Sequence, residues 1–257
     1  ERFIDVPALA FALKIPAVII ENVPGVVNDR KEVVAAARSL FQGDPEDPAG
    51  YHITEHVLDA SLMGWPQTRK RYFMVARRRD MGKPIELKDI QQILTTPSPF
   101  PVMWAIGDLE FAQLDDHMHR VANYSEENLE RMKWLHDNKE KGFDLPPEKH
   151  NPSHQQGTTY KGVYGRMNPD APAGTITTGF MTPGRGRYIH PTQMRTLTPH
   201  EAARIQGFPD SYRFQQPGED PPTSALLTKW IGDAVPMPLG YGAALSALGP
   251  GLPIQKL

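Results

Sequence analysis

A carboxylate directly follows the most apolar stretch in the first part of the chain. Glu21 and Asn22 come after the segment Pro-Ala-Val-Ile-Ile at 16–20, and Pro-Gly at 24–25 then turns the chain. A short apolar run without alternation is typical of a strand that is buried on both faces. In open α/β sheets ligands lie outside the carboxyl ends of such strands, so Glu21 is well placed for chemistry. The same residues could simply begin a turn, and this stretch alone leaves both interpretations open.

Two further segments with strand character, 51–58 and 71–76, flank a polar group formed by Gln67, Arg69 and Arg71. Their Val, Ile, Tyr and Phe residues predict strands. Together with a helix at 3–13, these strands predict that the first eighty residues form an α/β sheet region.

One pattern in this region suggests a different class of enzyme. His52, Glu55 and His56 match a zinc-peptidase motif, in which two histidines on a helix bind one metal. The surrounding residues favour a strand, on which residues four apart are separated by about 13 Å. A shared zinc ion needs ligands at about 2 Å, so we predict an ordinary strand and no metal site.

Helix signals recur along the rest of the chain. Asp29 can cap a helix that ends before Gly43, and Ser125 can cap a helix that runs to about residue 138. Thr198 and Glu201 form a capping box with Pro at the first helical position. The segment at 229–236 predicts a tight glycine turn that leads into a small-residue helix at 239–248.

Composition narrows the class of protein. The chain has 257 residues, 26 Pro, no Cys and a formal net charge of −2. It has no long apolar run, so we expect a soluble, cytoplasmic protein without a membrane partner. Without cysteine it can supply neither a thiolate metal site nor a cysteine nucleophile. A nucleic-acid partner would have to be held by local basic clusters.

Four ordered motifs resemble the later motifs of the DNA (cytosine-5)-methyltransferases. They are Glu-Asn-Val at 21–23, Gln-x-Arg-x-Arg at 67–71, an Arg-x-Leu-Thr to Gly-Phe-Pro segment at 195–209, and Ile-Gly-Asp-Ala-Val-Pro at 231–236. Their order and spacing match, including a variable region between the second and third. The resemblance implies an α/β fold in which the later part of a Rossmann-like methyltransferase sheet accompanies a small, loop-rich target-recognition domain.

The resemblance also implies a domain organisation. We expect residues 1–80 to form the carboxyl-side half of the catalytic core and residues 81–193 to form the target-recognition domain. Residues 194–257 would form a hinge helix and return to the core.

Catalytic roles follow from the same resemblance. In this family a thiolate attacks C6 of a cytosine flipped out of DNA, and an acid near N3 stabilises the charge that builds on the ring. That role falls to Glu21. We expect Arg71 to stabilise charge at O2 and Arg69 to hold the backbone or the nucleophile loop. Surface salt bridges remain the ordinary alternative for the two arginines.

Other residues of the motifs are expected to bind or to brace. The resemblance assigns structural roles to Asn22, Arg195 and Glu201, with Arg195 in a buried network. It places the methyl donor S-adenosylmethionine against the loop Gly232, Asp233, Ala234 and Val235. Asp233 stands where the family usually has Asn, and a carboxylate beside the cofactor's own carboxylate is unfavourable unless it is protonated or paired.

Contacts to double-stranded DNA are expected from polar residues in and before the variable region. Residues 175–178 and 185–189 predict short strands around Pro-Gly, and their hydroxyl and guanidinium groups suit phosphate contacts. They are equally ordinary for a hairpin surface. The predicted nucleic-acid contacts are Gln67, Thr175, Thr177, Arg185 and Arg187.

The family's Gly-rich cofactor loop and Pro-Cys nucleophile precede the Glu-Asn-Val motif, and this sequence contains neither. We therefore expect part of a DNA cytosine-5 methyltransferase that needs a second polypeptide or segment carrying them. The alternatives are a non-catalytic DNA-binding subunit and a tRNA cytosine-5 methyltransferase.

Overall fold

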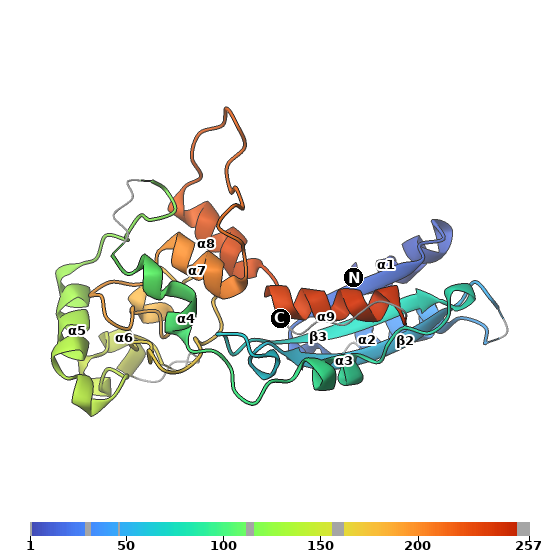
Figure 1. Ribbon diagram of the computed structural model, residues 1–257, viewed down its shortest axis with the longest axis horizontal. Coiled ribbons are helices and arrows are strands. Elements are labelled where there is room, and N and C mark those ends of the chain that lie inside the picture. Colours follow the sequence, from blue (N-terminus) through green and yellow to red (C-terminus); the bar gives the residue numbers. More distant parts are fainter. Residues whose placement is uncertain (1, 29–31, 46, 112–115, 156–161, 251–257) are drawn as a thin grey trace. The chain divides into compact units, whose positions relative to one another are not determined.

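A computed structural model describes residues 2–28, 32–45, 47–111, 116–155 and 162–250 (Figure 1). The chain forms two compact units. Unit 1 comprises residues 1–64, 69–98 and 238–257, and unit 2 comprises residues 65–68 and 99–237.

Unit 1 is built on a three-stranded antiparallel sheet. Its strands are β1 (Ala17–Asn22), β2 (Tyr51–Asp59) and β3 (Lys70–Arg78), in the order β1-β3-β2. All three predicted strands are confirmed. The prediction that the first strand is buried on both faces is wrong, because no residue of β1 is fully buried and Ile19 is 42% exposed. The physical reason is that β1 lies at an edge and pairs only with β3 among the described residues.

Helices cover both faces of this sheet. On one face, α1 (Arg2–Ala12) and α2 (Val33–Gln42) pack their apolar residues against β2 and β3. On the other face lie α3 (Leu87–Leu94) and α9 (Met237–Leu248), where Ile90 and Leu58 surround Gly242. The helix ends predicted at Gly43 and near residue 13 are confirmed, and the proposed cap Asp29 lies outside the described residues.

Unit 2 contains less regular structure. Its helices are α4 (Val102–Ile106), α5 (Glu126–Asp137), α6 (Pro152–Gln155), α7 (Pro199–Gln206) and α8 (Ser224–Asp233). The main core gathers apolar residues of α4, α7 and α8 with the segment around Phe180. Ser125 is the residue before α5, but its side chain makes no capping hydrogen bond, so this predicted cap is not confirmed. The capping box at Thr198 and Glu201 forms as predicted. Short 3-10 turns complete both units at 24–28, 61–63, 79–81, 107–109, 139–141, 147–149 and 183–185.

Two strands predicted in unit 2 do not form. Residues 175–178 make no ladder, and Ile189 makes only isolated bridges to Arg166 and Thr196. The Pro-Gly between the two segments folds into the 3-10 turn Pro183–Arg185 instead of a hairpin turn. Without a hairpin, the two segments cannot form a ladder of backbone hydrogen bonds with each other.

The unit boundaries differ from those predicted. Residues 81–98 belong to unit 1 because Glu86 and Leu87 bond to Thr54 on β2. The predicted return segment divides after residue 237, and only α9 returns to unit 1, where Ser246 bonds to Ile85. The proline content of the sequence indicated the loop-rich region but did not indicate the boundary between the two units.

The segment at 229–236 is helical rather than a tight turn. It continues α8 as far as Asp233, and Gly232 lies within the helix. A Cβ at Gly232 would lie 2.4 Å from backbone atoms of Thr177 and Thr178, so glycine is needed here for close approach.

Among the described residues, no helix combines the length and the apolar character that spanning a membrane requires.

Candidate active site

Glu21 and Arg71 form an ion pair at the end of the unit 1 sheet. Glu21 on β1 lies opposite Phe73 on β3, and Arg71 is two residues from Phe73, so both side chains project from the same face. Arg71 Nε lies 2.9 Å from Glu21 Oε1, and the side chains are 16% and 30% exposed. A carboxyl and a guanidinium held together and half-buried can address two neighbouring polar atoms of one ligand.

Asn22 supports the end of this strand. Its side-chain oxygen accepts a hydrogen bond from the backbone N–H of Val23 at 2.7 Å. An Asn side chain that accepts from a nearby backbone N–H favours a turn over a continued strand. The structural role of Asn22 stays a prediction, which this local contact supports.

Arg69 lies just before β3 and is only 2% exposed. Its backbone carbonyl accepts from Ala60, which fixes the chain where β2 and β3 diverge. A guanidinium so deeply buried supports the surrounding chain and does not face solvent. Of the two roles predicted for Arg69, holding the backbone suits this buried position better than holding the nucleophile loop.

Gln67 does not face a nucleic acid, and this prediction needs correction. Its side chain is fully buried, and its amide nitrogen donates to the Ile205 carbonyl and to Gln206 Oε1, both at 3.1 Å. Gln206 in turn donates to the Ile231 carbonyl. Buried amides of this kind must satisfy their hydrogen bonds inside the protein, so Gln67 ties the segment before β3 to α7 and α8.

The two threonines predicted to contact DNA are also engaged within unit 2. Thr175 Oγ1 donates to the Thr68 carbonyl at 2.9 Å, and Thr177 Oγ1 lies 2.8 Å from the Tyr188 hydroxyl. Sequence could not reveal the partner of Thr175, because Thr68 is 107 residues away, and the contact of Thr177 with Tyr188 depends on how the intervening loop folds. Both hydroxyls stabilise the loop, so neither is available as the predicted phosphate contact.

The two arginines of the same region differ from these threonines. Arg185 is exposed on its 3-10 turn. Arg187 is 32% exposed and pairs with Asp144, with 2.5 Å between Nη2 and Oδ1. Both side chains remain able to reach a ligand at the surface. Arg187 would first have to leave Asp144, and an exposed pair of this kind is weak.

Arg195 and Glu201 form the buried network that was predicted. Arg195 donates to both carboxylate oxygens of Glu201 at 2.7 Å, and the backbone N–H of Thr198 donates to Oε2 at 2.8 Å. His190 Nε2 lies 3.3 Å from Oε1. Burial alone would raise the pKa of Glu201, but hydrogen bonds from Arg195 and His190 outweigh it and lower that pKa to about 2.

Residues 3–246 match the sequence profile described as C-5 cytosine-specific DNA methylase. The match covers nearly all of the chain, including the segments that carry Glu21, Arg71 and the Arg195 network. The chain belongs to this family.

Individual relatives agree with this assignment. The chain is 37% identical over 233 residues to the type II methyltransferase M1.BsuMI of Bacillus subtilis, covering 90% of this chain and 51% of the relative. It is 32% identical over 211 residues to the type II methylase M.HgiDII of Herpetosiphon aurantiacus, covering 77% and 55%. This member of the cytosine-5 DNA methylase family therefore spans about half the length of the curated relatives it matches.

Solved structures show the same fold. A putative DNA modification methyltransferase encoded within a prophage of E. coli matches with a TM-score of 0.59 and 22% identity, covering 95% of this chain and 72% of that one. The Dnmt2 methyltransferase of S. pombe matches with a TM-score of 0.56 and 16% identity, covering 91% and 66%. The α/β class and the partial methyltransferase fold predicted from sequence are confirmed.

Membership of the family implies a methyl donor, and the segment Gly232 to Val235 is the predicted place for it. Gly232 leaves no room for a ligand on the side facing Thr177 and Thr178. The exposed carboxylate of Asp233 pairs with Lys229 at 2.7 Å. That pairing would relieve the repulsion expected from Asp233.

Sequence reasoning missed His190, which is completely buried against Glu201. Its Nδ1 accepts from the backbone N–H groups of Thr192 and Gln193 at 3.2 and 3.1 Å. This leaves the hydrogen on Nε2, facing the carboxylate. A lone histidine outside the motif gives no sequence signal for such a contact.

Proposed function

We propose that the chain is the part of a DNA cytosine-5 methyltransferase that presents Glu21 and Arg71 to a cytosine flipped out of the duplex. The observation that carries this proposal is the half-buried ion pair at the end of β1, with 2.9 Å between Arg71 Nε and Glu21 Oε1. The name of the family supports DNA as the substrate and cytosine as the base.

The two side chains suit the charge that develops on the ring. Attack of a thiolate at C6 leaves negative charge spread over N3 and O2. As the base displaces Arg71, Glu21 would take up a proton from solvent and donate it at N3, and the Arg71 guanidinium would move to O2. Arrival of the base would thus exchange the ion pair for two contacts that strengthen as the charge develops.

The thiolate must come from outside these 257 residues, because they include no cysteine. We propose that a second polypeptide, or another segment of a longer protein, carries the nucleophile and the Gly-rich loop. The exposed Ile19 on the edge strand β1 supports this, and so do Leu9 and Leu13, which are exposed on α1 and just after it. An unpaired edge with exposed apolar neighbours is suited to pairing with another strand.

S-adenosylmethionine is the methyl donor that we propose, and its activated methyl group is the chemistry it would supply. We propose that residues 232–235 contact it and that the partner supplies the remaining contacts.

Double-stranded DNA is the proposed substrate, and Arg185 and Arg187 are the proposed phosphate contacts in unit 2. Both guanidinium groups reach the surface, whereas the threonines nearby are engaged inside the unit. Removal of either arginine should make the salt dependence of DNA binding shallower.

Transfer of labelled methyl from S-adenosylmethionine to mixed-sequence DNA tests the proposal. It is measured with the chain alone and with a polypeptide that supplies the Gly-rich loop and Pro-Cys. Activity in the mixture that Glu21→Gln abolishes supports the proposal. No methyl transfer in either sample, with DNA binding retained, would favour a non-catalytic DNA-binding subunit. Transfer to tRNA but not to DNA would show that the substrate is tRNA.

A further inference from the structure

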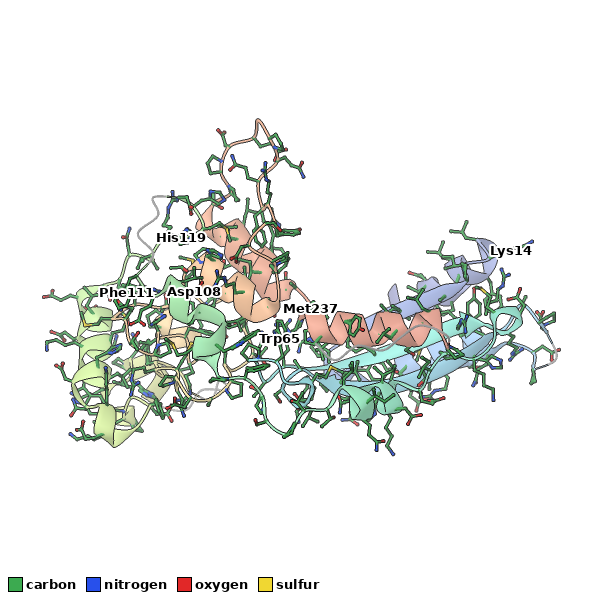
Figure 2. All side chains as sticks on the ribbon, viewed as in Figure 1. Lys14, Trp65, Asp108, Phe111, His119 and Met237 are labelled. Carbon is green, nitrogen blue, oxygen red and sulfur yellow. The ribbon has the colours of Figure 1, made fainter. Side chains whose placement is uncertain are left out.

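Four side chains in unit 2 form a continuous hydrogen-bonded chain, which we call the histidine clasp: Asp116, His119, His200 and Asp210. His119 Nδ1 lies 2.9 Å from Asp116 Oδ1, His119 Nε2 lies 2.9 Å from His200 Nδ1, and His200 Nε2 lies 2.9 Å from Asp210 Oδ1. The clasp joins the turn at 116–119, labelled at His119 in Figure 2, to the start of α7 and to the segment after α7.

Both ends of the clasp are acceptors. Asp116 Oδ1 also accepts from the backbone N–H groups of Met118 and His119 at 2.8 and 3.0 Å, and Asp210 accepts from Arg204 Nε at 2.8 Å. Burial would raise the pKa of Asp116, but hydrogen bonds from His119 and from backbone amides lower it. Hydrogen bonds from Arg204 and His200 lower the pKa of Asp210. Ionised carboxylates only accept, so the outer nitrogen of each ring must donate.

The hydrogens available to the clasp can then be counted. A neutral imidazole carries one N–H, and in each ring that hydrogen is committed to the carboxylate. The two inner nitrogens face each other at 2.9 Å and would both be bare lone pairs. We propose that His119 and His200 share one additional proton, so that the pair carries a single positive charge and the proton closes the clasp.

The surrounding charges favour this proton. Asp116 and Asp210 flank the pair, and beyond them Arg204 is held between Asp210 and Asp108. Counting the pair as one positive charge, the group has two positive and three negative charges. The His119 side chain is only 7% exposed, so burial by itself opposes the added charge, and the two flanking carboxylates must offset it.

Loss of the proton would open the clasp, because two lone pairs at 2.9 Å repel each other. The segments that would separate also line a cavity of about 370 Å³, with His117 and Met118 on one side and residues 212–218 on the other. The backbone N–H of His200 donates to the Met118 carbonyl at 2.9 Å across the same junction. The clasp is therefore a pH-sensitive device that controls how firmly the 116–119 turn is held on α7.

Nitrogen NMR of the labelled full chain tests the proton count without any substitution. Spectra of the ring nitrogens near neutral pH, assigned with His119→Ala and His200→Ala, show how many of the four carry hydrogen. Three hydrogens on the pair are expected. Two or four would overturn the proposal.

Hydrogen exchange tests the opening. The protection factor of the His200 amide is expected to fall about tenfold or more between about pH 6 and pH 9 in the unsubstituted chain. In His119→Ala it should be low at both values. His150→Ala is the matched control, because this histidine lies elsewhere in unit 2 and contacts the Leu145 carbonyl. A protection factor that does not change with pH in the unsubstituted chain would overturn the proposal, and this result does not depend on methyltransferase activity.

Discussion

The sheet end of unit 1 and the interior of unit 2 each hold an arginine and a glutamate in close contact. The shortest nitrogen to oxygen distances are similar, 2.9 Å for Arg71 and Glu21 and 2.7 Å for Arg195 and Glu201. The glutamates differ, because Glu21 is 30% exposed and has one such partner, whereas Glu201 is 1% exposed and is bonded on both oxygens. A pair that a ligand can still reach suits catalysis, and a completely satisfied buried pair suits structure.

The largest expected effect sharpens the catalytic side of this comparison. Glu21→Gln should lower methyl transfer in the reconstituted enzyme about a thousandfold, since an amide cannot deliver a proton to N3. The free energy of unfolding should change by less than about 1 kcal/mol, because the pair is partly exposed. Kinetics together with denaturant unfolding measure both. Normal activity would show that Glu21 has only a structural role.

Breaking the buried pair should have the opposite pattern. Arg195→Leu leaves the Glu201 carboxylate buried without its main partner, and unfolding should become easier by about 3 to 4 kcal/mol. Urea titration measures the loss. The conservative Arg195→Lys should recover part of it, because a single ammonium cannot reproduce the two parallel bonds. An unaffected midpoint in Arg195→Leu would contradict the role of this network.

Acid should weaken the interior of unit 2 because it protonates Glu201. The pKa of Glu201 is lowered to about 2 from an ordinary value of 4.5, so its ionised form stabilises the fold fully above about pH 4.5. As pH falls from 4.5 towards 2, about 3 kcal/mol of stability should be lost. Urea unfolding of the unsubstituted chain and of Glu201→Gln over this range should show a smaller loss in Glu201→Gln, in which only other carboxyls with a lowered pKa, such as Asp116 and Asp210, still contribute.

Close packing in unit 2 can be tested with two matched glycines. Gly232→Ala should cost about 2 kcal/mol or more, because its Cβ would lie 2.4 Å from the backbone of Thr177 and Thr178. Gly240→Ala on α9 meets nothing within 4 Å and should be neutral or slightly stabilising. Thermal unfolding of both variants measures the difference. Equal effects would mean that the contact at Gly232 is not tight.

The smallest effect on stability should come from the exposed pair of Arg187 and Asp144. Arg187→Ala should change the free energy of unfolding by less than about 0.5 kcal/mol. The slope of log binding constant against log salt for DNA should fall in magnitude by about 1 if Arg187 contacts a phosphate. Binding titrations at several salt concentrations measure this slope, and Lys133→Ala, which removes another exposed paired cation, is the control.

The sequence alone determined the local features of this protein. The β-branched segments at 17–22, 51–59 and 70–78 form strands, and the Thr198 and Glu201 spacing forms the capping box. These features depend on neighbours within a few residues, so propensity and periodicity contain the necessary information. The ordered motifs likewise sufficed to indicate the family.

Only the tertiary structure decided which polar side chains remain accessible. Gln67, Thr175 and Thr177 were predicted to be ligand contacts, but their hydrogen bonds are formed inside unit 2. Gln67 and Thr175 bond to Gln206 and Thr68, which lie more than 100 residues away, and Thr177 bonds to Tyr188 across a folded loop. The contact of His119 with His200, which are 81 residues apart, also depends on tertiary packing. Burial and long-range partners are set by how segments pack, and spacing along the chain does not contain that information.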